Sequence, residues 1–283
     1  MASGDLTLNV ASGDLTLNKY LSYGQDRALK VREMFSRLAR RYDLVNDVMS
    51  FGMHRKWKRE GVRLAIEGLA PRPARVLDLC CGTGDMSFLA ETMGASRVIG
   101  ADFTLPMLAV ARSRARKVTS RAAFAAADAL RLPFRDGVFD AVTVGYGLRN
   151  IADPQQALSE IRRVLAPAGR VVVLDFGKPE NPLARSIYFA YLKTMMPAVG
   201  WIFHGDPETY LYIPASLERY PAQRGVEHMM REAGFVNAQY ENRLLGTMGL
   251  NIGEAPGEPP LSSRAKRGIS SESEKIPRPS ASE

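Results

Sequence analysis

The stretch Arg75–Asp85, which reads RVLDLCCGTGD, decides the fold of this 283-residue chain. A short apolar run is followed by a loop with two glycines, and Asp85 can cap a helix that begins there. Glycines at such a point let a ligand approach the backbone, in the crevice beyond the carboxyl end of the strand. The stretch therefore predicts a strand, a ligand-binding loop and a helix in succession.

Both cysteines of the chain, Cys80 and Cys81, lie side by side in this loop. A disulfide between adjacent residues distorts the backbone, and two thiols fall short of the roughly four ligands of a zinc site. A thioredoxin-like motif would place two residues between them. We therefore interpret them as loop residues, and we expect no metal site.

The composition is that of an ordinary globular protein, with 46% hydrophobic and 24% charged residues. No apolar run approaches the roughly 20 residues that span a bilayer. The start, MASGDLTLN, lacks the basic and apolar regions of a secretion signal. With only two cysteines as well, the predicted location is cytoplasmic.

The net charge of +8 is concentrated near the front of the chain. Between Lys30 and Arg75 there are twelve Lys and Arg against five Asp and Glu, a local excess of +7. Solvated helix faces explain such a cluster, and so does attraction to anionic lipid headgroups. No nucleic-acid-binding motif accompanies the charge, so no nucleic acid partner is expected.

The chain divides into three parts by composition. Residues 1–25 contain a direct repeat, ASGDLTLN at Ala2–Asn9 and again at Ala11–Asn18, which we interpret as a flexible leader. Residues 26–253 form the folded domain. Residues 254–283 are rich in Pro, Ser and Glu with few apolar residues, and this predicts a disordered tail.

Helices and short strands alternate within the folded domain. Val31, Met34, Phe35 and Leu38 recur at helical spacing within the first helical region, Asp26–Glu67. The strand candidates are Arg75–Leu79, Arg97–Ala101, Ala122–Ala126, Phe139–Val144, Arg170–Leu174 and Asn237–Leu245. The helix candidates between them are Asp85–Met93, Leu105–Lys117, Pro154–Leu165 and Gln223–Ala233. This alternation predicts an α/β fold with a doubly wound, mostly parallel sheet, interrupted by the aromatic-rich segment Pro182–Pro221.

Acidic residues close successive strand candidates, at Asp78, Asp102 and Asp128. Each alone is equally well explained as a turn or helix cap, but three in succession favour a common site. Asp102 follows Gly84 by eighteen residues, where a carboxylate accepts both ribose hydroxyls of an adenosine cofactor. A dinucleotide motif, G-x-G-x-x-G, would need a third glycine where this chain has Ser87, which disfavours NAD.

This set of residues resembles the class I S-adenosylmethionine-dependent methyltransferases. The resemblance implies a Rossmann-like, seven-stranded sheet and S-adenosyl-L-methionine as cofactor. It also implies that Asp78 and the glycine loop hold the amino-acid end, that Asp102 binds the ribose and that Asp128 lies near the adenine. The cofactor-binding residues implied in this way are Asp78, Gly82, Thr83, Gly84, Asp102, Asp128, Ala129 and Gly145. Two positions depart from the family pattern: Cys80 replaces a common Gly, and Gly145 replaces a common Ser.

A more specific resemblance lies in three motifs outside the loop. Tyr42–Trp57 (YDLVNDVMSFGMHRKW), Tyr146–Asn150 (YGLRN) and Arg163–Arg170 (RVLAPAGR) with Asp175–Gly177 (DFG) are similar to signatures of the menaquinone/ubiquinone biosynthesis C-methyltransferases (UbiE-type). The similarity runs from about residue 31 to about residue 253. One departure is Asn251, where a His is common in this family.

This resemblance implies C-methylation of a prenylated quinol ring, with demethylmenaquinol converted to menaquinol as the leading prediction. The ubiquinol precursor 2-methoxy-6-polyprenyl-1,4-benzoquinol is an alternative acceptor, as is another small phenol or lipid. A third possibility is a non-catalytic protein that binds S-adenosylmethionine or a prenyl lipid. Transfer to carbon requires in-line positioning and a deprotonated hydroxyl that enriches the ring with electrons.

Four residues are candidates for the catalytic site: Arg149, Asn150, His54 and Tyr42. Arg149 stays charged and can face the developing phenolate, while Asn150 can orient the quinol or a relay water. His54 is a plausible base because its ordinary pKa lies near 6.5, and Tyr42 can hydrogen-bond the ring oxygen. The alternatives are a structural clamp for Arg149 and Asn150 and a packed histidine for His54.

An acceptor with an isoprenoid tail resides in the bilayer, so we expect peripheral contact with an anionic membrane at the inner face of the cell. The basic Lys30–Arg75 region and the aromatic Tyr188–Tyr220 segment are predicted to form a lid that faces this membrane. Alternatively, aromatic residues such as Tyr188 and Trp201 belong to an ordinary core.

Overall fold

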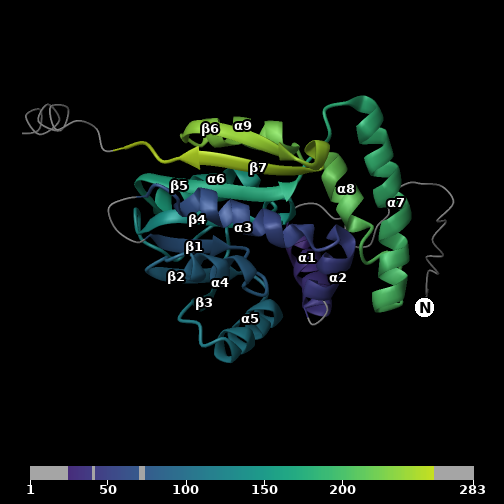
Figure 1. The fold of residues 1–283 in the computed structure, drawn as a ribbon, viewed down its shortest axis with the longest axis horizontal. Coiled ribbons are helices and arrows are strands. Elements are labelled where there is room, and N and C mark those ends of the chain that lie inside the picture. The colour runs from purple at the N-terminus through teal and green to yellow at the C-terminus, as the bar shows by residue number, and fades with distance from the viewer. Residues whose placement is uncertain (1–24, 40–41, 70–73, 258–283) are drawn as a thin grey trace, which may run out of the picture.

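A seven-stranded sheet forms the centre of the chain (Figure 1). The structure is a computed structural model that describes residues 25–39, 42–69 and 74–257. The strands are β1 (Arg75–Leu79), β2 (Arg97–Asp102), β3 (Ala123–Ala126), β4 (Phe139–Gly145), β5 (Leu165–Phe176), β6 (Val236–Arg243) and β7 (Met248–Glu254). Their order is β3-β2-β1-β4-β5-β7-β6; β1 to β5 pair in parallel, and β7 is antiparallel to β5 and β6. The predicted doubly wound, mostly parallel sheet is confirmed.

Nine α-helices form within the described residues; the four that were predicted between strands lie within one residue of their predicted bounds, whereas the predicted helical region Asp26–Glu67 divides into three. The nine helices are α1 (Gln25–Leu38), α2 (Tyr42–Ser50), α3 (Met53–Ile66), α4 (Asp85–Thr92), α5 (Leu105–Lys117), α6 (Pro154–Val164), α7 (Pro182–His204), α8 (Tyr212–Arg219) and α9 (Ala222–Glu232). The aromatic-rich segment becomes α7 and α8. Among the described residues, none of the helices combines the length and apolar character needed to cross a bilayer.

The core lies on both faces of the sheet, because side chains alternate between its faces along each strand. On one face, Val76 and Val172 pack with α3 and α4 around Trp57 and Met86. On the other face, the neighbouring residue Leu77 packs in a second cluster with α6 and α9. Buried parallel strands of this kind read as continuous apolar runs, which is the pattern of RVLDL and RVVVL.

The last strand extends the folded domain slightly beyond its predicted end. β7 covers a stretch in which the sequence pattern indicates no separate strand, and it ends at Glu254 rather than at residue 253. Ala255 is also buried. Apart from Gln25 and residues 254–257, the predicted leader and the predicted tail lie outside the described residues.

The parallel arrangement brings the carboxyl ends of β1, β2 and β4 to one edge of the sheet. Leu79, Asp102 and Gly145 end these strands and line a common cavity. The helices α1, α2, α7 and α8 gather beside this edge (Figure 1). Segments that lie far apart in the sequence therefore meet where the sequence predicts a ligand.

Candidate functional site

The loop after β1 is held in a left-handed conformation at three positions, Cys80 (φ 57°), Gly82 (φ 53°) and Gly84 (φ 90°). A Cβ on Gly84 would lie 3.0 Å from the ring of Phe124, so this position is closed to a side chain by packing as well. Cys80 tolerates a conformation that costs a non-glycine residue about 1–2 kcal/mol. Its Cβ occupies the space that a side chain on Gly147 would need.

The two cysteines are free thiols, with Cys80 half-buried and Cys81 buried. Burial raises the pKa of both thiols well above the ordinary value, and the neighbouring Asp78 and Asp102 raise it further. The protonated form is therefore favoured, whereas nucleophilic and metal-binding cysteines act as thiolates. This environment agrees with their interpretation as loop residues.

Asp102 organises the loop through its carboxylate. Oδ2 accepts a hydrogen bond from the backbone N–H of Gly82 at 2.9 Å, and Oδ1 accepts one from Thr104 at 2.7 Å. Burial raises the pKa of Asp102. A carboxylate has roughly four acceptor positions, so two remain for the hydroxyls of a ligand.

A cavity of about 920 Å³, including space open to solvent, lies beside this carboxylate. The predicted cofactor residues Gly82, Asp102, Asp128, Ala129 and Gly145 all line it. The other lining is mainly apolar, with Phe103, Met107 and Leu130 among the side chains. We call this space the adenosine-sized cavity, because its apolar walls suit a flat base and its two carboxylates suit the hydroxyl donors of a sugar.

Asp78 lies in a smaller recess on the other side of the glycine loop, together with Thr83. The register of β1 against β4 places Asp78 beside Thr143, whose hydroxyl donates to Oδ1 at 3.1 Å. Ser87, in the first turn of α4, donates to Oδ2 at 2.6 Å. Burial raises the pKa of Asp78 to about 6, although both hydroxyls oppose this shift.

Gly145 is explained by its neighbour Met86. A Cβ at position 145 would lie 2.5 Å from the sulfur of Met86, which fills the space that a Ser side chain would need. The absence of a hydroxyl here is therefore coupled to packing beneath β4. Asn251, the other departure, is buried and donates from Nδ2 to the backbone oxygen of Gln223 at 2.7 Å, a structural contact.

A second large cavity, of about 1180 Å³ with the space open to solvent, lies between α2, α3, α7 and α8. Its walls are mainly aromatic and apolar. They include Trp57, Tyr188, Tyr191, Met196 and Tyr212, and the polar side chains of His54 and Arg149 also line it. Tyr146 lines this cavity, the adenosine-sized cavity and the recess, so the three spaces meet at its side chain.

Arg149 is buried and forms an ion pair with Asp175 at 2.8 Å. The same guanidinium donates to the backbone oxygen of Tyr146 at 2.7 Å and to the hydroxyl of Tyr212 at 3.3 Å. It also lies 4.7 Å from the ring centre of Phe176. The residue clamps the end of β5 to the YGLRN turn, and it places a positive charge in the wall of the second cavity.

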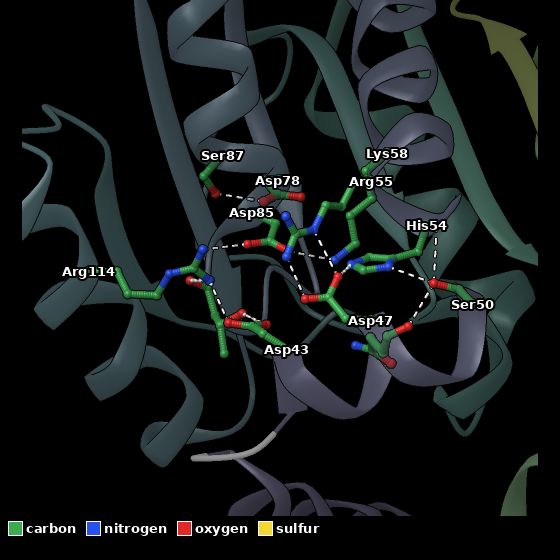
Figure 2. Close-up of polar contacts among 12 residues, drawn as sticks. Asp43, Asp47, Ser50, His54, Arg55, Lys58, Asp78, Asp85, Ser87 and Arg114 are labelled. Atoms are coloured by element: carbon green, nitrogen blue, oxygen red, sulfur yellow. Dashed lines mark hydrogen bonds and ion pairs between the residues drawn. The ribbon is translucent and has the colours of Figure 1, made fainter. Parts of the chain in front are cut away.

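The other three predicted catalytic residues do not all lie with Arg149 at the second cavity. Asn150 lines the adenosine-sized cavity, and its amide donates to Tyr146 O at 3.3 Å. His54 Nδ1 lies 2.8 Å from Ser50 Oγ, and Nε2 lies 3.7 Å from Asp47 Oδ1 (Figure 2). Burial lowers the pKa of His54. Tyr42 begins α2, and its side chain lies outside the described part of the structure.

The structure adds residues that the sequence analysis did not assign to the site. A polar network joins α2, α3, α4 and α5: Asp43 accepts from Thr83 (2.8 Å) and Arg114 (2.9 Å), and Asp85 accepts from Arg114 (2.7 Å) and Lys58 (2.7 Å) (Figure 2). Asp43 and Tyr146 fall inside motifs quoted above, and Lys58 directly follows one. The position of these three residues in or next to the motifs was therefore the signal in the sequence that could have assigned them to the site.

The sheet order and the cavities at its carboxyl edge define a class I methyltransferase fold. Solved structures agree. A possible histamine N-methyltransferase from Thermotoga maritima, described as S-adenosylmethionine-dependent, aligns with a TM-score of 0.51 at 20% identity, over 79% of this chain and 99% of that chain. The structure of a putative methyltransferase with the Haloferax volcanii Trm112 activator aligns with a TM-score of 0.57 at 20% identity, over 78% and 97%.

The sequence comparisons are more specific. The model of the ubiE/COQ5 methyltransferase family matches residues 23–254. A demethylmenaquinone methyltransferase of Thermus thermophilus is 44% identical over 79% of this chain and 100% of its own length. A ubiquinone/menaquinone biosynthesis C-methyltransferase of Cellvibrio japonicus is 40% identical over 82% of this chain and 94% of its own length. The chain belongs to the ubiE/COQ5 methyltransferase family.

Proposed function

We propose that this enzyme transfers the methyl group of S-adenosylmethionine to a ring carbon of reduced demethylmenaquinone. The observation that carries the proposal is the junction at Tyr146, where a cavity suited to an adenosine meets a larger aromatic cavity. A donor and an acceptor held in these two spaces would react across this junction. The relatives from Thermus thermophilus and Deinococcus radiodurans, both named demethylmenaquinone methyltransferases, support this acceptor.

The cofactor, S-adenosylmethionine, supplies a methyl group that its sulfonium already activates. The protein therefore has to orient it, and Asp102 is well placed to accept hydrogen bonds from the ribose. Asp128 is exposed and lines the same cavity, and we assign it to the adenine. Thr83, Gly84 and Ala129 complete our assignment by shaping the loop and the cavity wall.

The acceptor must become more nucleophilic, and two buried groups suit this task. Arg149 provides a permanent positive charge in the cavity wall, which stabilises a quinol oxygen as it loses its proton. His54 lines the same cavity, and its lowered pKa favours the neutral imidazole that can accept a proton. Asn150, which lines the adenosine-sized cavity, and Tyr42 remain our candidates for orienting the quinol ring.

The ubiquinol precursor is the second candidate acceptor, favoured by relatives whose name includes both pathways. An acceptor panel separates the two. Reduced short-chain demethylmenaquinone and 2-methoxy-6-prenyl-1,4-benzoquinone analogues are incubated with the enzyme and labelled S-adenosylmethionine, and kcat/KM is compared. A preference for the naphthoquinol of tenfold or more supports the leading proposal. Transfer to the benzoquinol alone, or to neither compound, contradicts it.

Membrane contact at the inner face of the cell is the remaining part of the proposal. Leu183, Ile187, Tyr191 and Met195 follow each other at four-residue spacing along α7 and are all exposed. Phe51, with 85% of its surface exposed, stands at the second cavity, which Tyr191 also lines. An exposed apolar stripe beside an aromatic cavity suits a substrate whose tail remains in the bilayer.

The basic region contributes less to this contact than its charge suggests. Arg37, Arg55, Lys58, Arg63 and Arg75 each form an ion pair with a carboxylate. We therefore propose that apolar insertion dominates over attraction to anionic headgroups.

Flotation with neutral and anionic vesicles tests this order of contributions. Binding should survive high salt and should fall in Phe51→Ser but not in Val118→Ser, an exposed apolar control directly after α5. Binding that high salt abolishes would instead support the electrostatic alternative.

A further inference from the structure

The small recess beside the glycine loop offers space for a part of a ligand that the adenosine-sized cavity does not hold. It measures about 330 Å³ with the space open to solvent, and its lining includes Asp78, Thr83 and Asp85. It shares Cys80, Gly82, Gly145 and Tyr146 with the adenosine-sized cavity. A ligand whose ribose lies at Asp102 would therefore extend past Gly82 into this recess.

Lys58 reaches the recess from α3, an element that the cofactor motifs do not include. Among the described residues that line the recess, it is the one with a positive charge. Its side chain is only 8% exposed, and Nζ donates to Asp85 Oδ2 at 2.7 Å. A buried ammonium is costly unless its donors are used, and it has three of them.

Lys58 shares its carboxylate partner with a second cation, so its charge is not fully balanced by that partner. Asp85, its partner, also accepts from Arg114 through Oδ1, and Arg114 is balanced in turn by Asp43 (Figure 2). These four groups sum to zero charge, so they suit a zwitterion better than a simple anion. Asp78 adds a carboxylate to the same recess, and this carboxylate would pair with the positive group of the zwitterion.

We propose that Lys58 binds the α-carboxylate of the methionine part of S-adenosylmethionine. The inference rests on the proposed cofactor and extends it to a residue outside the glycine loop. Lys58 is also one residue from Trp57 and one turn from His54, which both line the acceptor cavity. A single helix, α3, then anchors the amino-acid end of the cofactor and forms a wall of the acceptor site.

The test uses three ligands that differ at the amino-acid end: S-adenosylhomocysteine, its decarboxylated analogue and 5′-methylthioadenosine, which lacks the amino acid. In calorimetric titrations the wild type should bind the decarboxylated analogue roughly 10- to 100-fold more weakly than S-adenosylhomocysteine, as expected for lost hydrogen bonds to a charged group. Lys58→Gln, whose amide can still donate to Asp85, should lose a similar factor for S-adenosylhomocysteine and bind methylthioadenosine normally. Lys56→Gln, at an exposed position of α3, should match the wild type with every ligand.

Two results would overturn the assignment. One is equal affinity of the wild type for S-adenosylhomocysteine and its decarboxylated analogue, a measurement that depends on no variant. The other is an equal loss of affinity for all three ligands in Lys58→Gln, which would mark a purely structural role. Failure of the folded wild type to bind any of the three ligands would overturn the proposed cofactor and this assignment with it.

Discussion

Asp78→Asn should stabilise the ligand-free enzyme at neutral pH while weakening its hold on the cofactor. Burial raises the pKa of Asp78 to about 6 from an ordinary value of 3.8. A tenfold change in proton affinity corresponds to about 1.4 kcal/mol, so this rise in pKa means that ionised Asp78 costs the folded state about 3 kcal/mol at pH 7.5. The amide is neutral and avoids this cost, and the hydroxyls of Ser87 and Thr143 can still pair with it.

The sign of the pH dependence follows from proton binding. Between pH 3.8 and about 6 the folded chain retains the proton of Asp78 while the unfolded chain has released it. Rising pH therefore favours the unfolded state in this window, and the penalty is complete above it. The advantage of Asp78→Asn should grow from about 1 kcal/mol at pH 4.5 to about 3 kcal/mol at pH 7.5.

Urea unfolding followed by circular dichroism measures this difference at both pH values. Asp136→Asn, where the carboxylate is 80% exposed, is the control and should stay within about 0.5 kcal/mol of wild type. In parallel, the wild-type affinity for S-adenosylmethionine should fall as pH drops through about 6, and this dependence should vanish in Asp78→Asn. A variant that is less stable than wild type at pH 7.5, or a difference that ignores pH, would refute the reasoning.

Three further substitutions test the site. Arg149→Ala leaves Asp175 buried without its cation and should cost about 3–5 kcal/mol in urea unfolding; a loss below about 1 kcal/mol would contradict the clamp. Asp102→Asn should weaken S-adenosylhomocysteine binding roughly 10- to 100-fold by calorimetry. The amide has a single acceptor oxygen, which cannot accept from both the loop N–H groups and the ribose hydroxyls. Gly145→Ser should lower stability by about 1–3 kcal/mol through its contact with the sulfur of Met86. Met86→Ala in the same chain should reduce that loss, and an unchanged loss would show that another contact causes it.

The sheet was predictable because its signals are local and repeat along the chain. Arg97–Asp102 and Phe139–Gly145 are short, largely apolar runs that end at an acidic residue or a glycine, and parallel pairing brings these ends to one edge. The positions of Asp102 and Asp128 on one cavity follow from this rule without further knowledge of packing. β7 was harder to identify, because MGLNIGE alternates with glycines and has no polar face.

The remaining features of the site depend on contacts between distant segments. Gly147 leaves room for the side chain of Cys80, and α4, β2, α5, β3 and β4 lie between these two residues in the sequence. The separation of Asn150 from His54 into different cavities depends on how α3 and the YGLRN turn are oriented. The position of Lys58 behind the glycine loop likewise depends on the packing of α3 against α4.

Transfer of the methyl group to carbon is the central claim, and one measurement tests it directly. The enzyme is incubated with S-adenosylmethionine carrying a trideuterated methyl group and with a reduced short-chain demethylmenaquinone, and the product is analysed by mass spectrometry and NMR. We predict a product with one deuterated methyl group on the quinol ring carbon. Unmodified quinol from a folded sample that binds S-adenosylhomocysteine, or a methyl group on oxygen, would contradict the account.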